Sequence, residues 1–314
     1  MSDTLVQERP SLPRRLWKYQ SERFPLVQHA PLILAFTFSA ASYSRIIRGV
    51  PGFITAIEYA IGAISALGLF MLLRIFDEFK DADEDAAHRP YRPVPRGLVT
   101  LCELAGVGIA IVAVALALNA LVMPRMLWPW LLSLGYMLLM GREFFVREWL
   151  KRHPIVYMVS HMIILPTIDF YTTGLDWINR GVDAPDGIAW FLLLTFLNGI
   201  VIEVGRKIRG ADAEEPGVET YSALYGARRA TIGWLCVLAA TASTAVIAAT
   251  HAGFGAVGFI VLATFVIASA LPALRFLRSG EHRDARRIEY AAGVWTIAMY
   301  LTLGAVPMLV DLFG

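Results

Sequence analysis

The chain has 314 residues, of which 57% are hydrophobic and 17% charged, and its formal net charge is +2. Its mean hydropathy is +0.56. Soluble domains contain fewer apolar and more charged residues, so this composition excludes an ordinary soluble enzyme and indicates a polytopic membrane protein. We expect the lipid bilayer as a partner and no nucleic acid.

In chain order, the first thirty residues are polar and basic and lack a compact apolar core, so they do not resemble a cleavable signal peptide. We expect residues 1–28 to be a cytoplasmic segment. A spanning helix needs about 20 mostly apolar residues, and nine runs approach this length. They lie at about 31–49, 54–74, 98–120, 127–141, 155–174, 188–205, 231–250, 253–274 and 290–311.

These runs predict an all-α polytopic membrane protein with about nine transmembrane helices, forming a single domain over residues 1–314. The boundaries of the fourth and fifth runs are the least sharp, because the fourth is short and the fifth contains His161, Pro166 and Asp169. Cys102 and Cys236 fall inside the third and seventh runs. We expect both cysteines to pack in the core rather than to form a disulfide or bind a metal.

Positive charge is distributed unevenly between alternate connections. Of the 28 Lys and Arg residues, four lie in the odd-numbered connections, and the other 24 lie in the N-terminal segment and the even-numbered ones. The four are Arg45, Arg48, Arg125 and Arg180. The positive-inside rule then places the N-terminus and the even-numbered loops in the cytoplasm. We expect a multi-pass protein of the cell's inner (plasma) membrane.

An acidic block, DEFKDADEDAAHRPYRPVPRG, begins at Asp77 directly after the second run. If the second helix continues through this block, residues advance by about 100° each, and four carboxylates share an arc of about 100°. They are Asp77, Glu78, Asp81 and Asp85. Hard oxygen ligands at the mouth of a membrane suit Mg²⁺, which binds through one or two carboxylates together with water and phosphate. The alternative is a solvated helix end whose acids pair with Lys80, His88 and Arg89.

A proline-stiffened basic segment, from Arg92 to Gly97, follows the acids at once. Arginine suits bidentate contact with phosphate oxygens. Metal-binding acids beside phosphate-binding arginines therefore indicate a site for a metal-bound phosphorylated ligand at a membrane surface.

The pattern Asp77-Glu78-x-x-Asp81-x-x-x-Asp85 resembles the first aspartate-rich motif, NDxxDxxxD, of the UbiA superfamily of intramembrane prenyltransferases. Here Asp replaces the leading Asn, and Glu replaces the first Asp. The segment RPVPRG is similar to that family's RPLPSG-like segment, and the nine helices match the family pattern over almost the whole chain. The resemblance implies helices around a central cavity, a Mg²⁺ cofactor and a prenyl diphosphate substrate.

The chain departs from the family after the sixth run. Where the family has a second aspartate-rich stretch, Glu203 is followed by Arg206, Lys207 and Arg209, with Asp212, Glu214 and Glu215 further on. The later residues Gly217, Thr220 and Gly226 are similar to the family's tail. Two carboxylate clusters would hold two metals, whereas one carboxylate cluster opposite a basic cluster could hold one metal and contact the diphosphate directly; the sequence leaves the number of metals open. The alternative explanation of the three cations is membrane topology alone.

Ionisable residues inside apolar runs are functional candidates by default. His161 and Asp169 could line the cavity and orient an acceptor or handle a proton, although Asp169 could instead bond to Thr172 or Thr173. Asn198 could face the cavity or form a hydrogen bond between helices. The residues expected to bind substrate are Arg92, Arg96, Arg142, His161, Asn198, Arg206, Lys207 and Arg209. The resemblance implies catalytic roles for Asp77, Asp81, Asp85 and Glu203, and metal binding by Asp77, Glu78, Asp81 and Asp85.

The implied activity is that of a Mg²⁺-dependent prenyltransferase, a transferase of alkyl groups other than methyl. It would move a prenyl group from an allylic diphosphate to a small aromatic or lipophilic acceptor whose identity is unknown. Two alternatives are a UbiA-type intramembrane terpene cyclase, which needs no acceptor, and a non-enzymatic lipid-binding or transport protein.

Overall fold

A computed structural model of the protein describes residues 10–214 and 219–313. Within these ranges the regular structure is helical, and eight helical segments are long and apolar enough to cross a membrane. They are α2 (Leu26–Ile47), α3 (Ala56–Lys80), α5 (Leu101–Val122), α8 with α9 (Pro154–Gly174), α10 (Ile188–Arg206), α12 (Ala227–His251), α13 (Ala256–Ser279) and α14 through α15 (His282–Phe313). The predicted all-α membrane fold is confirmed.

Shorter helices complete the chain: α1 (Leu12–Arg23), α4 (Ala82–His88), α6 (Leu127–Gly141), α7 (Arg147–Lys151) and α11 (Tyr221–Tyr225). Single 3₁₀ turns lie at Pro124–Met126, Glu143–Phe145 and Ala211–Ala213. The fifth predicted run is divided at Ile163 into α8 (Pro154–Met162) and α9 (Ile164–Gly174). A π-helical turn, Leu301–Ala305, joins α14 (His282–Tyr300) to α15 (Val306–Phe313).

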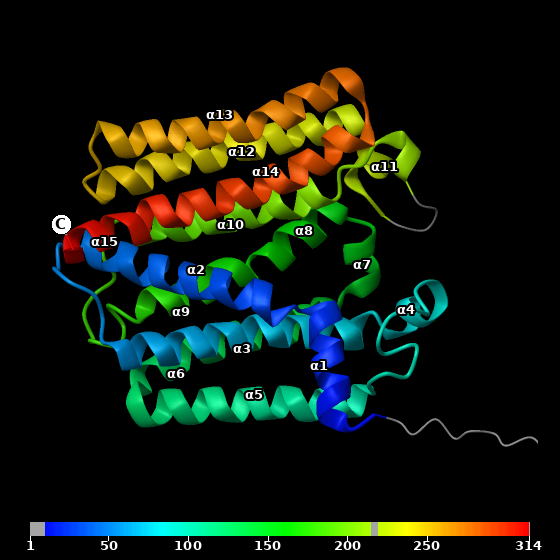
Figure 1. The fold of residues 1–314 in the computed structure, drawn as a ribbon, viewed down its shortest axis with the longest axis horizontal. Coiled ribbons are helices and arrows are strands. Elements are labelled where there is room, and N and C mark those ends of the chain that lie inside the picture. The colour runs from blue at the N-terminus through cyan, green and yellow to red at the C-terminus, as the bar shows by residue number, and fades with distance from the viewer. Residues whose placement is uncertain (1–9, 215–218, 314) are drawn as a thin grey trace, which may run out of the picture.

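The fourth predicted run forms α6, whose 15 residues extend for about 22 Å at 1.5 Å per residue. This is shorter than the roughly 30 Å hydrocarbon core of a bilayer. Figure 1 nevertheless shows α7, which follows α6 in the chain, at the same end of the bundle as α4 and α11, whereas α6 is labelled near the opposite end. Among the described residues, eight of the nine predicted runs thus form helical segments long and apolar enough to cross a membrane, and the remaining run forms the shorter α6.

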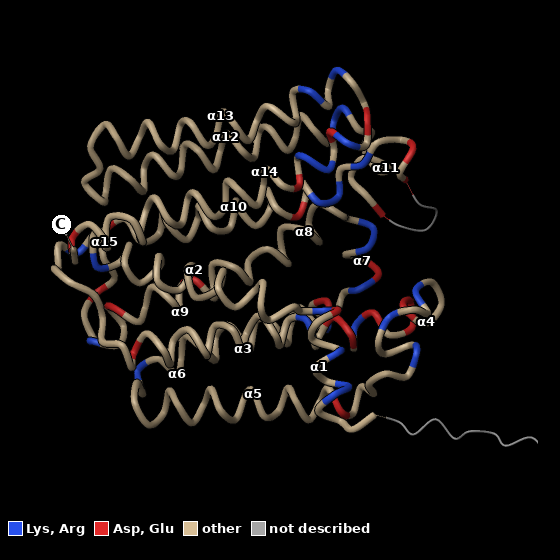
Figure 2. Tube along the Cα trace, viewed as in Figure 1, with Lys and Arg blue, Asp and Glu red and all other residues tan. Residues whose placement is uncertain are grey.

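Charged residues gather at the end of the bundle that carries α1, α4, α7 and α11 (Figure 2). We call this the charged end, and the opposite one the far end. The segregation expected from the sequence is thus a property of the folded protein. The four far-end arginines contact polar partners there: Arg45 and Arg48 donate to Asp176, Arg180 donates to Glu58, and Arg125 donates to the Asn179 carbonyl. The Asp176 side chain is fully buried.

The helices pack around two large clusters of buried apolar side chains, beside two smaller ones near α1 and the start of α2. One surrounds Trp234 and Trp295 among α10, α12, α13 and α14, and the other surrounds Trp130 and Tyr171 among α3, α6 and α9. Helix α2 contributes to both clusters and so joins them. The π-helical turn lies close against α2, because a Cβ atom on Gly304 would come within 2.0 Å of the Ser39 carbonyl oxygen.

The prediction that the two cysteines pack in the core is wrong. Cys102 in α5 and Cys236 in α12 are both free and exposed. In a membrane protein the outward face of a helix meets lipid, which is as apolar as the interior. An apolar run around a cysteine therefore does not indicate which face the cysteine occupies.

Candidate active site

The acidic block does not continue α3 as one helix, which corrects the expectation of a single carboxylate face. Helix α3 ends at Lys80, and α4 begins at Ala82. Asp81 between them has φ −98° and ψ 10°, which is not helical. Asp85 therefore belongs to a separate short helix, and Figure 1 shows α4 as a distinct element at the charged end.

Two of the four expected metal ligands form buried ion pairs. Glu78 is 2% exposed, and its Oε1 accepts from Arg23 Nε at 2.5 Å and lies 3.5 Å from Arg74 Nη2. Asp85, also 2% exposed, pairs with Arg89 at 3.1 Å and with Arg92. Their charges are therefore compensated by arginines.

Asp77 and Asp81 have weaker partners. Asp77 lies 3.4 Å from Arg74, and Asp81 lies 3.9 Å from Lys80. Their side chains are 39% and 32% exposed. Burial raises the pKa of the Asp81 carboxyl; Lys80 opposes this, and Asp77 and Asp85 add to it. Negative charge that the protein compensates poorly at this point is where a bound cation would be most stabilising.

Two carboxylates of the acidic block, and not four, are placed where they could bind Mg²⁺. In the two described ranges, no three His, Cys, Asp or Glu side chains lie close enough to hold an ion together. Mg²⁺ retains several waters and is often bound by one or two carboxylates with substrate phosphates. Asp77 and Asp81, separated by one helical turn, fit that mode, whereas a ligand set of four carboxylates is not assembled.

Lys80 and Tyr157 lie beside Asp81 and His161, although the sequence analysis did not name either of them as a site residue. The Lys80 ammonium donates to the Tyr157 hydroxyl at 2.9 Å, and the Tyr157 ring stacks on His161 with centroids 3.9 Å apart. The signal that could have found Tyr157 is its place four residues before His161, because residues i and i+4 share one helix face.

The end of α10 approaches from the other half of the bundle. Glu203 is 8% exposed and pairs with Arg206 Nη2 at 2.5 Å and Lys207 Nζ at 2.9 Å. Arg206, together with Lys80, is among the cations whose charge acts on Asp77. The two motif regions thus meet at the charged end, as expected. Glu203 already pairs with two cationic side chains, so it is poorly suited to bind a second metal.

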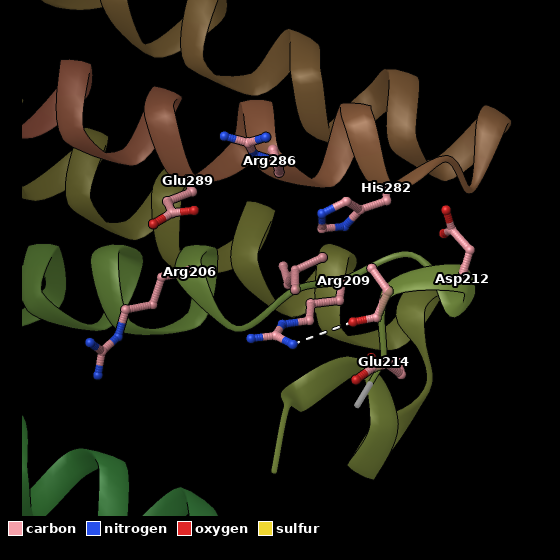
Figure 3. Close-up of a pocket in the computed structure, with 9 residues that line it drawn as sticks. Arg206, Arg209, Asp212, Glu214, His282, Arg286 and Glu289 are labelled. Carbon is pink, nitrogen blue, oxygen red and sulfur yellow. Dashed lines mark hydrogen bonds between the residues drawn. The ribbon is translucent and has the colours of Figure 1, made fainter. Parts of the chain in front are cut away.

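Arg209 follows Arg206 and Lys207 in the connection after α10. Its guanidinium donates to the Ala213 carbonyl at 3.3 Å, and it lines a polar hollow of about 560 Å³. Figure 3 shows Arg206 at the edge of this hollow, with its guanidinium turned away from His282 and Asp212. Arg206 and Arg209 thus both line the hollow, and Arg206 and Lys207 also pair with Glu203. Glu214 accepts from Thr220 at 2.7 Å, while Glu215 and Gly217 lie outside the described residues.

The remaining candidates are spread over the bundle. Arg96 pairs with Glu22 at 2.8 Å, and Arg142 is exposed at the end of α6. Deeper in the bundle, Asn198 donates to Thr296 at 2.9 Å. Asp169 is buried and accepts from Tyr300 at 2.6 Å and from Thr172 at 3.4 Å. The helix–helix bond considered for Asn198 and the threonine bond considered for Asp169 are both present.

The helices and the charged end define a multi-pass membrane protein whose ionisable groups gather at one end of the bundle. The family model of the UbiA prenyltransferase family matches residues 29–306, so the chain belongs to that family. No curated protein sequence matches it.

Two solved structures show the same fold. One is the apo structure of a UbiA homolog from Aeropyrum pernix K1, with a TM-score of 0.66 and 18% identity, covering 91% of this chain and 99% of that one. The other concerns digeranylgeranylglyceryl phosphate synthase in membranes, with a TM-score of 0.65 and 12% identity, covering 94% and 99%.

Proposed function

We propose that the protein is a Mg²⁺-dependent intramembrane prenyltransferase that moves a prenyl group from an allylic diphosphate to a small aromatic or lipophilic acceptor. Membership of the UbiA family supports prenyl transfer in general. The observation that carries the finer proposal is the division of the acidic block. Glu78 and Asp85 are held in buried ion pairs, while Asp77 and Asp81 remain half-exposed beside Lys80 and Arg206.

In this proposal Asp77 and Asp81 hold Mg²⁺, which would neutralise charge on the diphosphate. Lys80, Arg206 and Lys207 supply fixed positive charge where negative charge develops as the diphosphate leaves, and such preorganised charge stabilises a transition state. The apolar helices exclude water from the prenyl chain. We further propose that the charged end faces the cytoplasm and that the membrane is the inner (plasma) membrane, because 24 of the 28 Lys and Arg residues lie on that side.

The experiment is incubation of purified protein with Mg²⁺ and a panel of allylic diphosphates, with and without aromatic or lipophilic acceptors, followed by product analysis. Diphosphate release that depends on an acceptor supports a transferase. Release with cyclised product and no acceptor would identify a cyclase instead, and no release from any donor would refute enzymatic function. Asp83→Asn is the matched control for Asp81→Asn, because Asp83 is exposed in α4. Loss of activity in both variants would contradict the assignment of Asp81.

A further inference from the structure

We propose that His161 is the base that takes the proton lost by the acceptor during prenyl transfer. The inference rests on the proposed function and deepens it, since it assigns an acceptor that loses a proton from a hydroxyl group or from an aromatic carbon.

The first observation is an unused nitrogen on a buried ring. His161 is 8% exposed, and its Nδ1 lies 2.8 Å from the Tyr157 carbonyl oxygen. A carbonyl accepts hydrogen bonds and does not donate them, so Nδ1 carries the hydrogen, and the lone pair of the neutral ring is on Nε2. Nε2 is buried and has no hydrogen-bond partner in the part of the chain that the structure describes. Buried polar atoms are nearly always satisfied, so this one requires an explanation.

The second observation is where the ring lies. Figure 1 shows α8 between α3 and α10 near the charged end. The ring stacks on Tyr157, whose hydroxyl accepts from Lys80, the neighbour of Asp81. The charged groups that act on His161 are Lys80 from α3 and Glu203 and Lys207 from α10. One stacked ring thus separates the free nitrogen from the residues proposed to bind metal and diphosphate.

The third observation is how the ring is held. Tyr157 stacks on one face at an interplanar angle of 16°, and Phe144 approaches edge-on with centroids 6.1 Å apart. Together with the bond from Nδ1, these contacts fix the tautomer and the direction of Nε2. A preset tautomer is what a general base requires before its substrate arrives.

Prenyl transfer exchanges the bond between prenyl C1 and the diphosphate oxygen for a bond between C1 and the acceptor. The C1–O bond of the donor breaks, and its electron pair leaves with the diphosphate. The acceptor's hydroxyl oxygen or ring carbon gives an electron pair to C1, forming the new bond. That atom must then lose its proton, and the Nε2 lone pair accepts it to give an imidazolium. The proton passes from the ring to the departing diphosphate or to water at the charged end.

The test compares His161→Phe with His153→Phe in the full-length protein. Phenylalanine keeps an aromatic ring against Tyr157 but has no lone pair. His153 is a close match in local geometry, since its Nδ1 lies 2.7 Å from the Trp149 carbonyl and its ring stacks on Trp149 at 4.5 Å, but it is exposed. Each variant is assayed for acceptor-dependent transfer, donor KM, acceptor-independent diphosphate release and melting temperature.

For His161→Phe we expect kcat of transfer to fall by about 10²- to 10⁴-fold, the usual contribution of a general base. Donor KM and acceptor-independent release should stay within about twofold of wild type, as fits a base that acts after donor ionisation. His153→Phe should match wild type. Transfer at the wild-type rate in His161→Phe, or transfer and release falling by the same factor, would overturn the assignment.

A second variant guards against a folding defect. His161→Ala leaves room for free imidazole, and added imidazole should restore part of its transfer activity; no restoration would count against the proposal. Failure of the proposed function can be distinguished from failure of the role of His161 alone. If wild type releases no diphosphate from any donor, the proposed function fails and the role of His161 fails with it. If wild type transfers and His161→Phe transfers equally well, the role of His161 fails alone.

Discussion

Glu78 and Asp81 stand three residues apart in one motif, yet the structure predicts opposite responses to their neutralisation. We expect Glu78→Gln to destabilise the protein and to leave Mg²⁺ dependence intact. We expect Asp81→Asn to abolish Mg²⁺-dependent turnover without destabilising it. The reason is that Glu78 is 2% exposed and paired with Arg23 and Arg74, whereas the nearest cation to the half-exposed Asp81 lies at 3.9 Å.

The magnitudes follow from these contacts. Removing one partner of a buried ion pair costs about 3–5 kcal/mol. Arg23 and Arg74 retain 13% and 25% side-chain exposure, so water can partly compensate them, and we expect about 2–3 kcal/mol for Glu78→Gln. At roughly 2–4 °C per kcal/mol for a protein of this size, the melting temperature should fall by about 4–12 °C.

For Asp81→Asn the sign is reversed. Burial raises the pKa of this carboxyl above its ordinary value. The folded protein therefore holds the ionised form at a cost in stability when the pH exceeds that raised pKa, and a neutral amide removes this cost. Without Mg²⁺ the variant should be at least as stable as wild type.

The assay is thermal unfolding in detergent with and without Mg²⁺, combined with a Mg²⁺ titration of diphosphate release. A cation that binds the folded protein raises its melting temperature. This shift should persist in Glu78→Gln and disappear in Asp81→Asn. Loss of the shift in Glu78→Gln, with unchanged metal-free stability, would refute the reasoning and make Glu78 a ligand.

Three further outcomes are expected. Arg206→Ala should lower kcat/KM for the donor by about 10- to 100-fold, because a charge-assisted contact contributes about 1.5–3 kcal/mol. Arg209→Ala should have a smaller effect, because Arg206 is one of the cations whose charge acts on Asp77; equal effects in correctly inserted protein would contradict this difference. Asp176→Asn should lower stability by about 3 kcal/mol, because it leaves Arg45 and Arg48 beside a neutral partner, with donor KM unaffected, as thermal unfolding and kinetics would show. EDTA should stop turnover and added Mg²⁺ restore it, and full activity in EDTA would remove the metal from the mechanism.

The membrane fold could be predicted from the sequence because its signal is local. A run of about 20 apolar residues is a helix in a bilayer whatever its neighbours are, since backbone groups in lipid must be satisfied within the segment. The same locality explains the failures. Whether Cys102 faces lipid or protein depends on which helices pack against α5, and neither apolar composition nor helix length contains that information.

The candidate site could be predicted only in part for a similar reason. The acidic block could be recognised as a motif in the sequence. Which of its acids form buried ion pairs could not be predicted, because the pairing depends on partners distant in sequence. Arg23 precedes Glu78 by 55 residues, and Lys80 meets Tyr157 across 77 residues. The break between α3 and α4 at Asp81 could not be predicted from local composition, because residues 77–85 contain no Gly or Pro.

The N-terminal helix α1 explains why Glu78 differs from Asp77 and Asp81. At the charged end, Arg15 pairs with Glu103 of α5, Glu22 with Arg96, and Arg23 with Glu78 of α3, while Tyr19 is 2% exposed against Ile75 and Leu104. Arg96 lowers the pKa of Glu22, so that pair is ionised at neutral pH.

Apolar contacts between membrane helices gain little over contacts with lipid. Ion pairs and one buried tyrosine at the aqueous margin therefore have a large share in fixing the ends of α3 and α5. Because Arg23 of α1 pairs with Glu78, the carboxylates that remain available on α3 and at its end are Asp77 and Asp81. Under the proposed function, the metal-binding pair is selected in this way by a helix outside the motif, and not by the spacing of the acids within it.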